Sequence, residues 1–175
     1  MLPSPLHPAL VHFPIVLILL GTLVALVAIF VRRWHLAWIA AALLGFGAIG
    51  AVTAAWTGNG EKEIVGEMNA SADQALDRHE DWGERTRNAA IVAALLAIGA
   101  AASVRRVPTF SRLASVITAC AALAASCCVA VTGHYGGQLV YKHGAGINTA
   151  AGPLAENAGS PSNGAANQHK ADDDD

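Results

Sequence analysis

The residues of this 175-residue chain that could do chemistry are histidines near the ends of apolar segments. Neutral imidazole is a ligand for zinc, copper and haem iron. His134 and His143 occur in the stretch TGHYGGQLVYKHGAG, which follows an apolar run and is rich in glycine. His12 lies near the start of the first apolar run, and His79 lies in a charged stretch in the middle of the chain. These four histidines are the candidate cofactor-binding residues.

Composition identifies the elements that must position these histidines. The chain is 54% hydrophobic and 14% charged, with a mean hydropathy of +0.43. Three of its four apolar runs are long enough to cross a ~30 Å hydrocarbon core as helices, and the third run is shorter. None alternates in the manner of a barrel strand, so all four are predicted to be helices. The runs are Ala9–Val31, Leu36–Trp56, Ala89–Val104 and Leu113–Thr132.

The sequence therefore predicts an all-α fold, an integral membrane four-helix bundle over residues 1–147. The remaining residues, 148–175, are rich in Gly, Ala, Asn and Pro and end in four aspartates. Such a composition is typical of a disordered extension. Nucleic acid is not an expected partner, because the chain has a net charge of −2 and no basic domain.

The arginines predict the orientation in the membrane. Arg32 and Arg33 follow the first run, while Arg105, Arg106 and Arg112 follow the third, and neither connection contains Asp or Glu. The positive-inside rule places both connections in the cytoplasm. Both termini and the long middle loop then face the periplasm, in a bacterial inner membrane. The first run lacks a basic start and a clear cleavage site, so it is interpreted as a retained span and not a signal peptide.

Counting residues from the arginines gives the depth of two histidines. At the rise of an α-helix, His12 lies roughly 31 Å from Arg33, and His134 lies roughly 33 Å from Arg112. Both imidazoles are therefore expected at one level near the outer boundary of the bilayer, on the first and last helices of the bundle.

The middle stretch EIVGEMNASADQALDRHEDW contributes the third histidine. Its apolar or small positions recur every three or four residues, which predicts an amphipathic periplasmic helix between spans 2 and 3. This helix either lies on the membrane surface or is the raised start of span 3. His79 belongs to the apolar face and is expected to point into the mouth of the bundle. The face comprises Val65, Met68, Ala72, Ala75, Leu76, His79 and Trp82.

The histidine set favours haem over other cofactors. The sequence contains neither HExxH nor CxxC, so a structural zinc site is poorly supported, and the absence of CxxCH excludes covalent haem. A b-type haem needs two axial ligands, an apolar slot and small residues around it. Its ligands are expected among His12, His79 and His134, which are also the candidates for the alternative, a copper ion. His143 is expected to ligate a second centre or to bond a propionate.

Small residues allow two interpretations. Gly45, Gly47 and Gly50 in the second run could pack against a neighbouring helix or could leave room for a macrocycle. Cys120, Cys127 and Cys128 lie inside the fourth run, where a free thiol behaves as a small hydrophobe.

Three segments resemble a known family. HPALVHFPIVLILL at the start, HEDWGERTRNAAI before the third run and GGQLVYKHGAG after the fourth resemble a bacterial membrane family catalogued as the domain of unknown function numbered 2231. The resemblance covers roughly residues 5–147. It implies a four-helix membrane domain that is distantly similar to cytochrome b-type haem bundles, and it carries over His12, His79, His134 and His143 as functional candidates.

Two functions remain open from the sequence. The first is a b-type haem electron-transfer subunit that relays electrons between a quinol pool or membrane complex and a periplasmic carrier such as a c-type cytochrome. The second is a non-redox accessory or assembly subunit of a larger membrane complex, or a periplasm-facing copper binder. The chain contains no nucleophile–base set and no phosphate loop, so electron transfer is favoured over catalysis by this chain alone.

Overall fold

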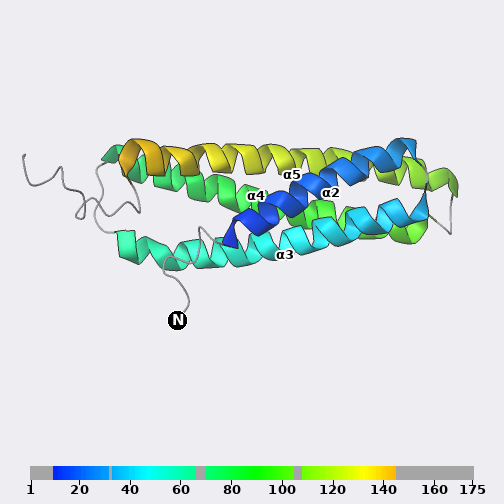
Figure 1. Cartoon of the computed structure of the whole chain (residues 1–175), viewed down its shortest axis with the longest axis horizontal. Helices are drawn as coiled ribbons and strands as arrows, with labels where there is room; N and C mark the ends of the chain where they lie inside the picture. The colour runs from blue at the N-terminus through cyan, green and yellow to red at the C-terminus, as the bar shows by residue number, and fades with distance from the viewer. Residues whose placement is uncertain (1–9, 32, 66–69, 105–107, 145–175) are drawn as a thin grey trace, which may run out of the picture. The chain divides into compact units, whose positions relative to one another are not determined.

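Four long helices form the part of the chain that the computed structural model describes, residues 10–31, 33–65, 70–104 and 108–144. They are α2 (His12–Phe30), α3 (Trp34–Val65), α4 (Ala70–Ser103) and α5 (Pro108–His143), shown in Figure 1. All four are long and apolar enough to cross a membrane, which confirms the predicted all-α four-span fold. They belong to one compact unit, Met1–Ala145. The second unit, Gly146–Asp175, contains the whole expected tail and lies outside the described residues.

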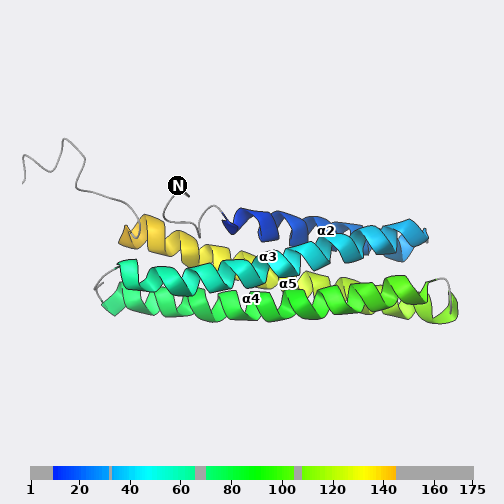
Figure 2. The same cartoon turned by 90° about the horizontal axis from the view of Figure 1, so that it is seen from below.

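The helices form a closed ring of neighbours. Each helix packs against the helix before and after it in the sequence, and α2 closes the ring by packing against α5 (Figures 1 and 2). Successive helices run in opposite directions, as in an up-and-down bundle. Figure 1 shows α2 running obliquely, from the side of α3 at its start to the side of α5 at its end.

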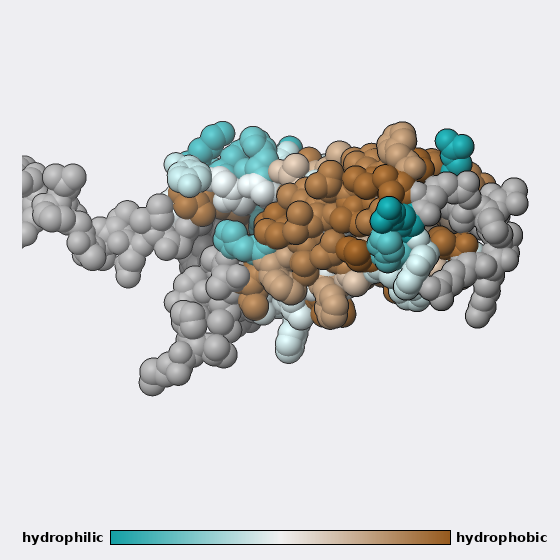
Figure 3. Space-filling view, turned by 45° about the vertical axis from the view of Figure 1, so that its right-hand side comes forward, coloured by the Kyte–Doolittle hydropathy of each residue, from teal (hydrophilic) through white to brown (hydrophobic). Residues whose placement is uncertain are grey.

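The interior of the bundle consists mainly of small residues. Alanines of α3, α4 and α5 make up most of the buried core, whereas large apolar side chains such as Leu23, Phe46 and Leu95 are exposed. This distribution is the reverse of that in a soluble bundle, where large apolar side chains fill the core. In lipid, small residues let helix backbones approach closely, and the outward apolar side chains contact acyl chains. Figure 3 shows the resulting apolar band between more hydrophilic ends.

At one end of the bundle, α3, α4 and α5 extend well beyond α2. α2 has 19 residues, while α3, α4 and α5 have 32, 34 and 36. We call the end where α2 begins and α5 ends the histidine end, and the end where α2 ends and α5 begins the arginine end. From Ala70 on, the amphipathic stretch is the first half of α4, which is the second of the two expected arrangements. Val65 of the predicted face instead ends α3, and Met68 lies outside the described residues.

A close contact joins α2 to α3. Ile18 and Leu44 are the largest fully buried side chains, and each lies against a glycine of the other helix. A Cβ built on Gly47 would lie 2.9 Å from Ile18 Cγ1, and one built on Gly21 would lie 2.9 Å from Leu44 Cγ. The same construction at Gly45 meets nothing within 4 Å. Plain helix packing therefore explains Gly47.

A buried hydroxyl joins α2 to α5. Thr22 Oγ1 lies 2.9 Å from the hydroxyl of Ser126 and 3.1 Å from the carbonyl oxygen of Ala122. It also lies 2.8 Å from the carbonyl of Ile18 in its own helix. Because carbonyl oxygens only accept, the single proton of Thr22 is directed at the carbonyls and Ser126 donates to Thr22.

Replacing Thr22 with valine is expected to destabilise the folded bundle by about 1 kcal/mol, since interhelical hydrogen bonds in membranes contribute this order of free energy. Thr53→Val is the matched control, because the Thr53 hydroxyl bonds the carbonyl of Gly50 in its own helix. Reversible unfolding of the detergent-solubilised protein measures the difference. Equal unfolding free energies for the two variants would contradict an interhelical role for Thr22.

Candidate functional site

His79 lies between α4 and α5 and is held there by the backbone of α5. Its Nδ1 lies 3.0 Å from the carbonyl oxygen of Thr132. Because a carbonyl only accepts, Nδ1 carries the proton and Nε2 is the basic nitrogen of the neutral ring. The ring is packed over Gly136, where a Cβ would lie 3.0 Å from Cε1 and 3.2 Å from Nδ1. A glycine is thus needed at position 136, where this imidazole packs against α5.

Threonine hydroxyls support the same contact about two turns further along α4. Thr86 Oγ1 and Thr132 Oγ1 lie 2.9 Å apart, and each also bonds the carbonyl four residues earlier in its own helix. Thr132 therefore contacts α4 twice, through its carbonyl and through its hydroxyl. The stretch TGHYGG drew attention for His134, but Thr132 and Gly136 of that stretch are the residues that bind His79. Their spacing of four, on one face of a helix, was the available signal.

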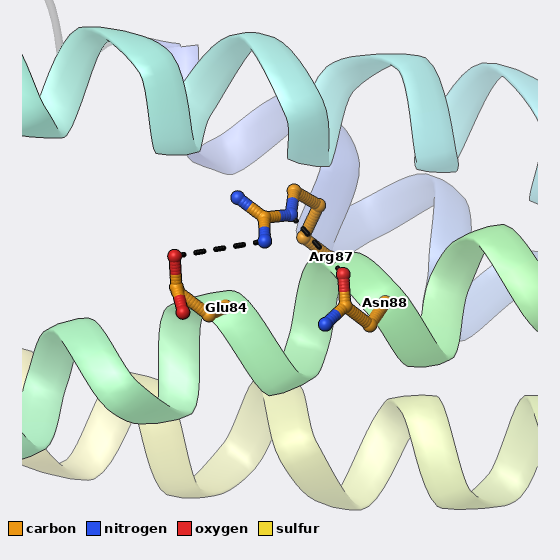
Figure 4. Close-up of polar contacts among 3 residues, drawn as sticks. All are labelled: Glu84, Arg87 and Asn88. Atoms are coloured by element: carbon orange, nitrogen blue, oxygen red, sulfur yellow. Dashed lines mark hydrogen bonds and ion pairs between the residues drawn. The ribbon is translucent and has the colours of Figure 1, made fainter.

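The polar start of α4 carries several weaker contacts at its surface. Arg78 Nη1 lies 3.2 Å from Tyr135 Oη, and the Arg85 guanidinium lies 4.7 Å from the centre of the Trp82 ring. Figure 4 shows Arg87 between α4 and α3, with its Nη2 3.6 Å from Glu84 Oε1 and its Nε 3.2 Å from Asn88 Oδ1. Exposed pairs of this kind contribute little to stability.

His12 and His134 lie at one level along the bundle, as the residue count predicts. Thr22 of α2 is paired with Ser126 of α5, and these helices run in opposite directions. Ten residues back from Thr22 is His12, and eight residues on from Ser126 is His134, so the two positions differ in height by about 3 Å at the rise of a helix. Both side chains are exposed.

Both histidines also lie on the same outer side of the α2–α5 pair. At about 100° per residue, His12 is about 80° around α2 from Thr22, on the side away from the α3-facing Gly21. His134 is about 80° around α5 from Ser126, on the side away from the α4-facing Thr132. These two side chains therefore lie on the same outer side of the bundle, while His79 is on the opposite face of α5 from His134.

Near His134, the surface of α5 that faces α2 has open space around it. A Cβ built on Gly133 or on Gly137 meets nothing within 4 Å. The contacts between α2 and α5 lie further toward the arginine end, at Thr22 and at the packing of Ala25 against Ala119. The glycines beside His134 thus leave space next to the start of α2.

The last candidate, His143, lies at the end of α5. His143 is half-buried at the end of α5 and lies on the α4-facing side, seven residues from Gly136. His134 Nε2 lies 2.7 Å from Gln138 Nε2, so the amide donates to the lone pair of the ring. Among the described residues, no three His, Cys, Asp or Glu side chains are grouped so that they could hold a metal ion. The structure therefore places His79 in a contact on the α4-facing side of α5, apart from His134.

A family model described as predicted membrane protein (DUF2231) matches residues 3–149 of the chain. No curated protein and no solved structure matches the chain. The matched range includes all four helices, from the start of α2 to the end of α5. The chain therefore belongs to the DUF2231 family of predicted membrane proteins, as a multi-pass protein with four helices that can span a membrane.

Proposed function

We propose that the chain is a b-type haem subunit of a bacterial inner membrane, with His12 and His134 as the axial ligands of one haem at the histidine end. This end faces the periplasm in the proposal, because the arginine-rich connections occupy the other end. The subunit relays electrons between a quinol pool or membrane complex and a periplasmic carrier such as a c-type cytochrome.

The observation that carries the proposal is the shared level of the two imidazoles on the same outer side of α2 and α5. Two ligands from adjacent antiparallel helices are what a six-coordinate haem needs. The open space at Gly133 and Gly137 gives room for the edge of a macrocycle. The lone pair of His134 Nε2 accepts from Gln138, so Gln138 would have to release this bond for the nitrogen to bind iron.

The side chains near His12 on α2 suit a haem in their chemistry. Large apolar side chains of α2, among them Val16 and Leu19, are exposed on its outward side and suit an apolar ring. When bound, the haem supplies a one-electron couple. Two histidine ligands leave iron with no open position, which favours electron transfer over oxygen chemistry.

Absorption spectra of the full chain purified in detergent test this proposal. A Soret band and a sharp band on dithionite reduction are expected for the wild type. His12→Ala and His134→Ala should each abolish both bands. His35→Ala is the matched control, because His35 is exposed at the start of α3, at the arginine end. His79→Ala should also retain the haem, since that ring is held by Thr132.

Two results would overturn the assignment. A colourless protein with no pyridine haemochrome rejects haem, and copper in that protein would favour the metal-binding alternative. A haem that survives in His12→Ala or His134→Ala and is lost in His79→Ala would move the ligands to the α4–α5 contact.

A further inference from the structure

A cavity of about 120 Å³ opens at the arginine end, away from the histidines. Arg33, just before α3, and Arg112 and Ser115, near the start of α5, provide its polar lining. Small and apolar residues of α2, α3 and α4, such as Ala28 and Ala37, form the rest of the wall. The cavity therefore combines two guanidinium groups with an apolar interior.

The space continues inward to a buried hydroxyl. A smaller void of about 10 Å³ shares Ala28, Ala37 and Ser115 with the cavity and reaches Thr118. Thr118 is 4% exposed, and its Oγ1 finds no hydrogen-bond partner in the part of the chain that the structure describes.

Thr118 differs in this respect from three other threonines of the core. Thr22, Thr86 and Thr132 each bond the carbonyl four residues earlier in the same helix. That bond is the usual way in which a helical threonine satisfies its hydroxyl in an apolar environment. A buried hydroxyl that the described residues leave without a partner points to a water or a ligand at this place.

The arginine end also has positive charges without acidic residues nearby in the sequence. The chain contains no Asp or Glu in residues 1–60 or 85–155, and these ranges include both connections at the arginine end. The acidic residues of α4 lie at the other end, between Asp73 and Glu84. Two guanidinium groups at the mouth of a cavity without a carboxylate in the surrounding segments are suited to an anion from outside the chain.

We infer that this cavity binds one phosphate group, held by Arg33 and Arg112 at the mouth. Guanidinium forks match the oxygens of phosphate in a bidentate manner. Ser115 lines the wall, and the Thr118 hydroxyl bonds a water or an oxygen of the same ligand below it. The phosphate belongs either to an anionic phospholipid, whose head group lies at this depth, or to the inorganic ion.

The competing explanation is that the arginines only anchor the helices to lipid head groups. Such anchoring depends on charge and not on the shape of the side chain. Arg33→Lys and Arg112→Lys retain the charge but remove the fork, so they separate a specific site from an electrostatic anchor.

Native mass spectrometry of the delipidated full chain, titrated with phosphatidylglycerol in one series and inorganic phosphate in another, tests the inference. One saturable adduct is expected in at least one series, and the series that binds identifies the source. Each lysine variant should bind about tenfold more weakly, the equivalent of one hydrogen bond to a charged group. Arg85→Lys, at the other end of the bundle, should bind as the wild type does.

Thr118→Val adds a second readout. Without ligand, the variant should melt at a higher temperature than the wild type, because it removes an unsatisfied buried hydroxyl. With saturating ligand, this advantage should shrink or reverse. Absence of saturable binding in both series overturns the inference, as does binding that both lysine variants leave unchanged. A constant difference in melting temperature with and without ligand would remove Thr118 from the site.

Discussion

Gly47→Ala is expected to destabilise the folded bundle by about 1–3 kcal/mol, the usual cost of overpacking a close-packed core. The added Cβ would lie 2.9 Å from Ile18 Cγ1 and 3.3 Å from the Ile18 backbone nitrogen. Ile18 is fully buried, so its side chain has no space into which it can turn. The backbone contact can be relieved only if α2 and α3 move apart, which weakens the packing along both helices.

Gly45→Ala is the control for this prediction. Gly45 lies half a turn away on the same helix, and a Cβ there meets nothing within 4 Å. The substitution also favours the helix by up to about 1 kcal/mol, since alanine has the higher helix propensity. Unfolding of both variants in one detergent gives the comparison. If Gly47→Ala is as stable as Gly45→Ala, close packing of α2 on α3 at this position is refuted.

The spans were predictable because a bilayer requires long apolar helices. Each of the four apolar runs falls within, or nearly within, one observed helix. The helix ends were less predictable, because apolar composition marks where the membrane ends and not where the helix ends. α3 continues past Trp56 to Val65, and α4 starts at Ala70, far before the apolar run at Ala89. Helix-forming residues such as Ala, Glu, Arg and Gln continue α4 through water.

The depth of the candidate histidines along their helices was predictable, but the side of the helix that faces each neighbour was not. Residue counts along a helix give height, so His12 and His134 are expected at one level, and the register set by Thr22 and Ser126 agrees with this. The periodicity of α4 also indicated that His79 faces the bundle, where it contacts Thr132. Which side of α5 faces α2 and which faces α4 depends on packing between helices, and no single helix contains that information. Hence the sequence could not show that His79 and His134 lie on opposite faces of α5.

The contact of His79 with α5 leads to the second large effect. Gly136→Ala is expected to displace the imidazole and break its bond to Thr132, because the new Cβ would lie 3.0 Å from Cε1 and 3.2 Å from Nδ1. The expected loss of unfolding free energy is about 1–2 kcal/mol, from a strained contact and a lost hydrogen bond. In the nitrogen NMR spectrum of histidine-labelled protein, the Nδ1-protonated signal that His79→Ala removes should shift in Gly136→Ala.

A double-mutant cycle separates this contact from a general effect of adding a methyl group to α5. In a His79→Ala background the ring is absent, so Gly136→Ala should cost nothing or should stabilise the helix slightly. Gly83→Ala, on α4 about one turn from His79, controls for the substitution itself, because a Cβ there meets nothing within 4 Å. Because the two residues touch only through the imidazole, their coupling energy should equal nearly the whole cost of the single variant. A penalty of the same size in both backgrounds would show that Gly136 is required by something other than His79, and the contact between α4 and α5 at this level would have to be reassigned.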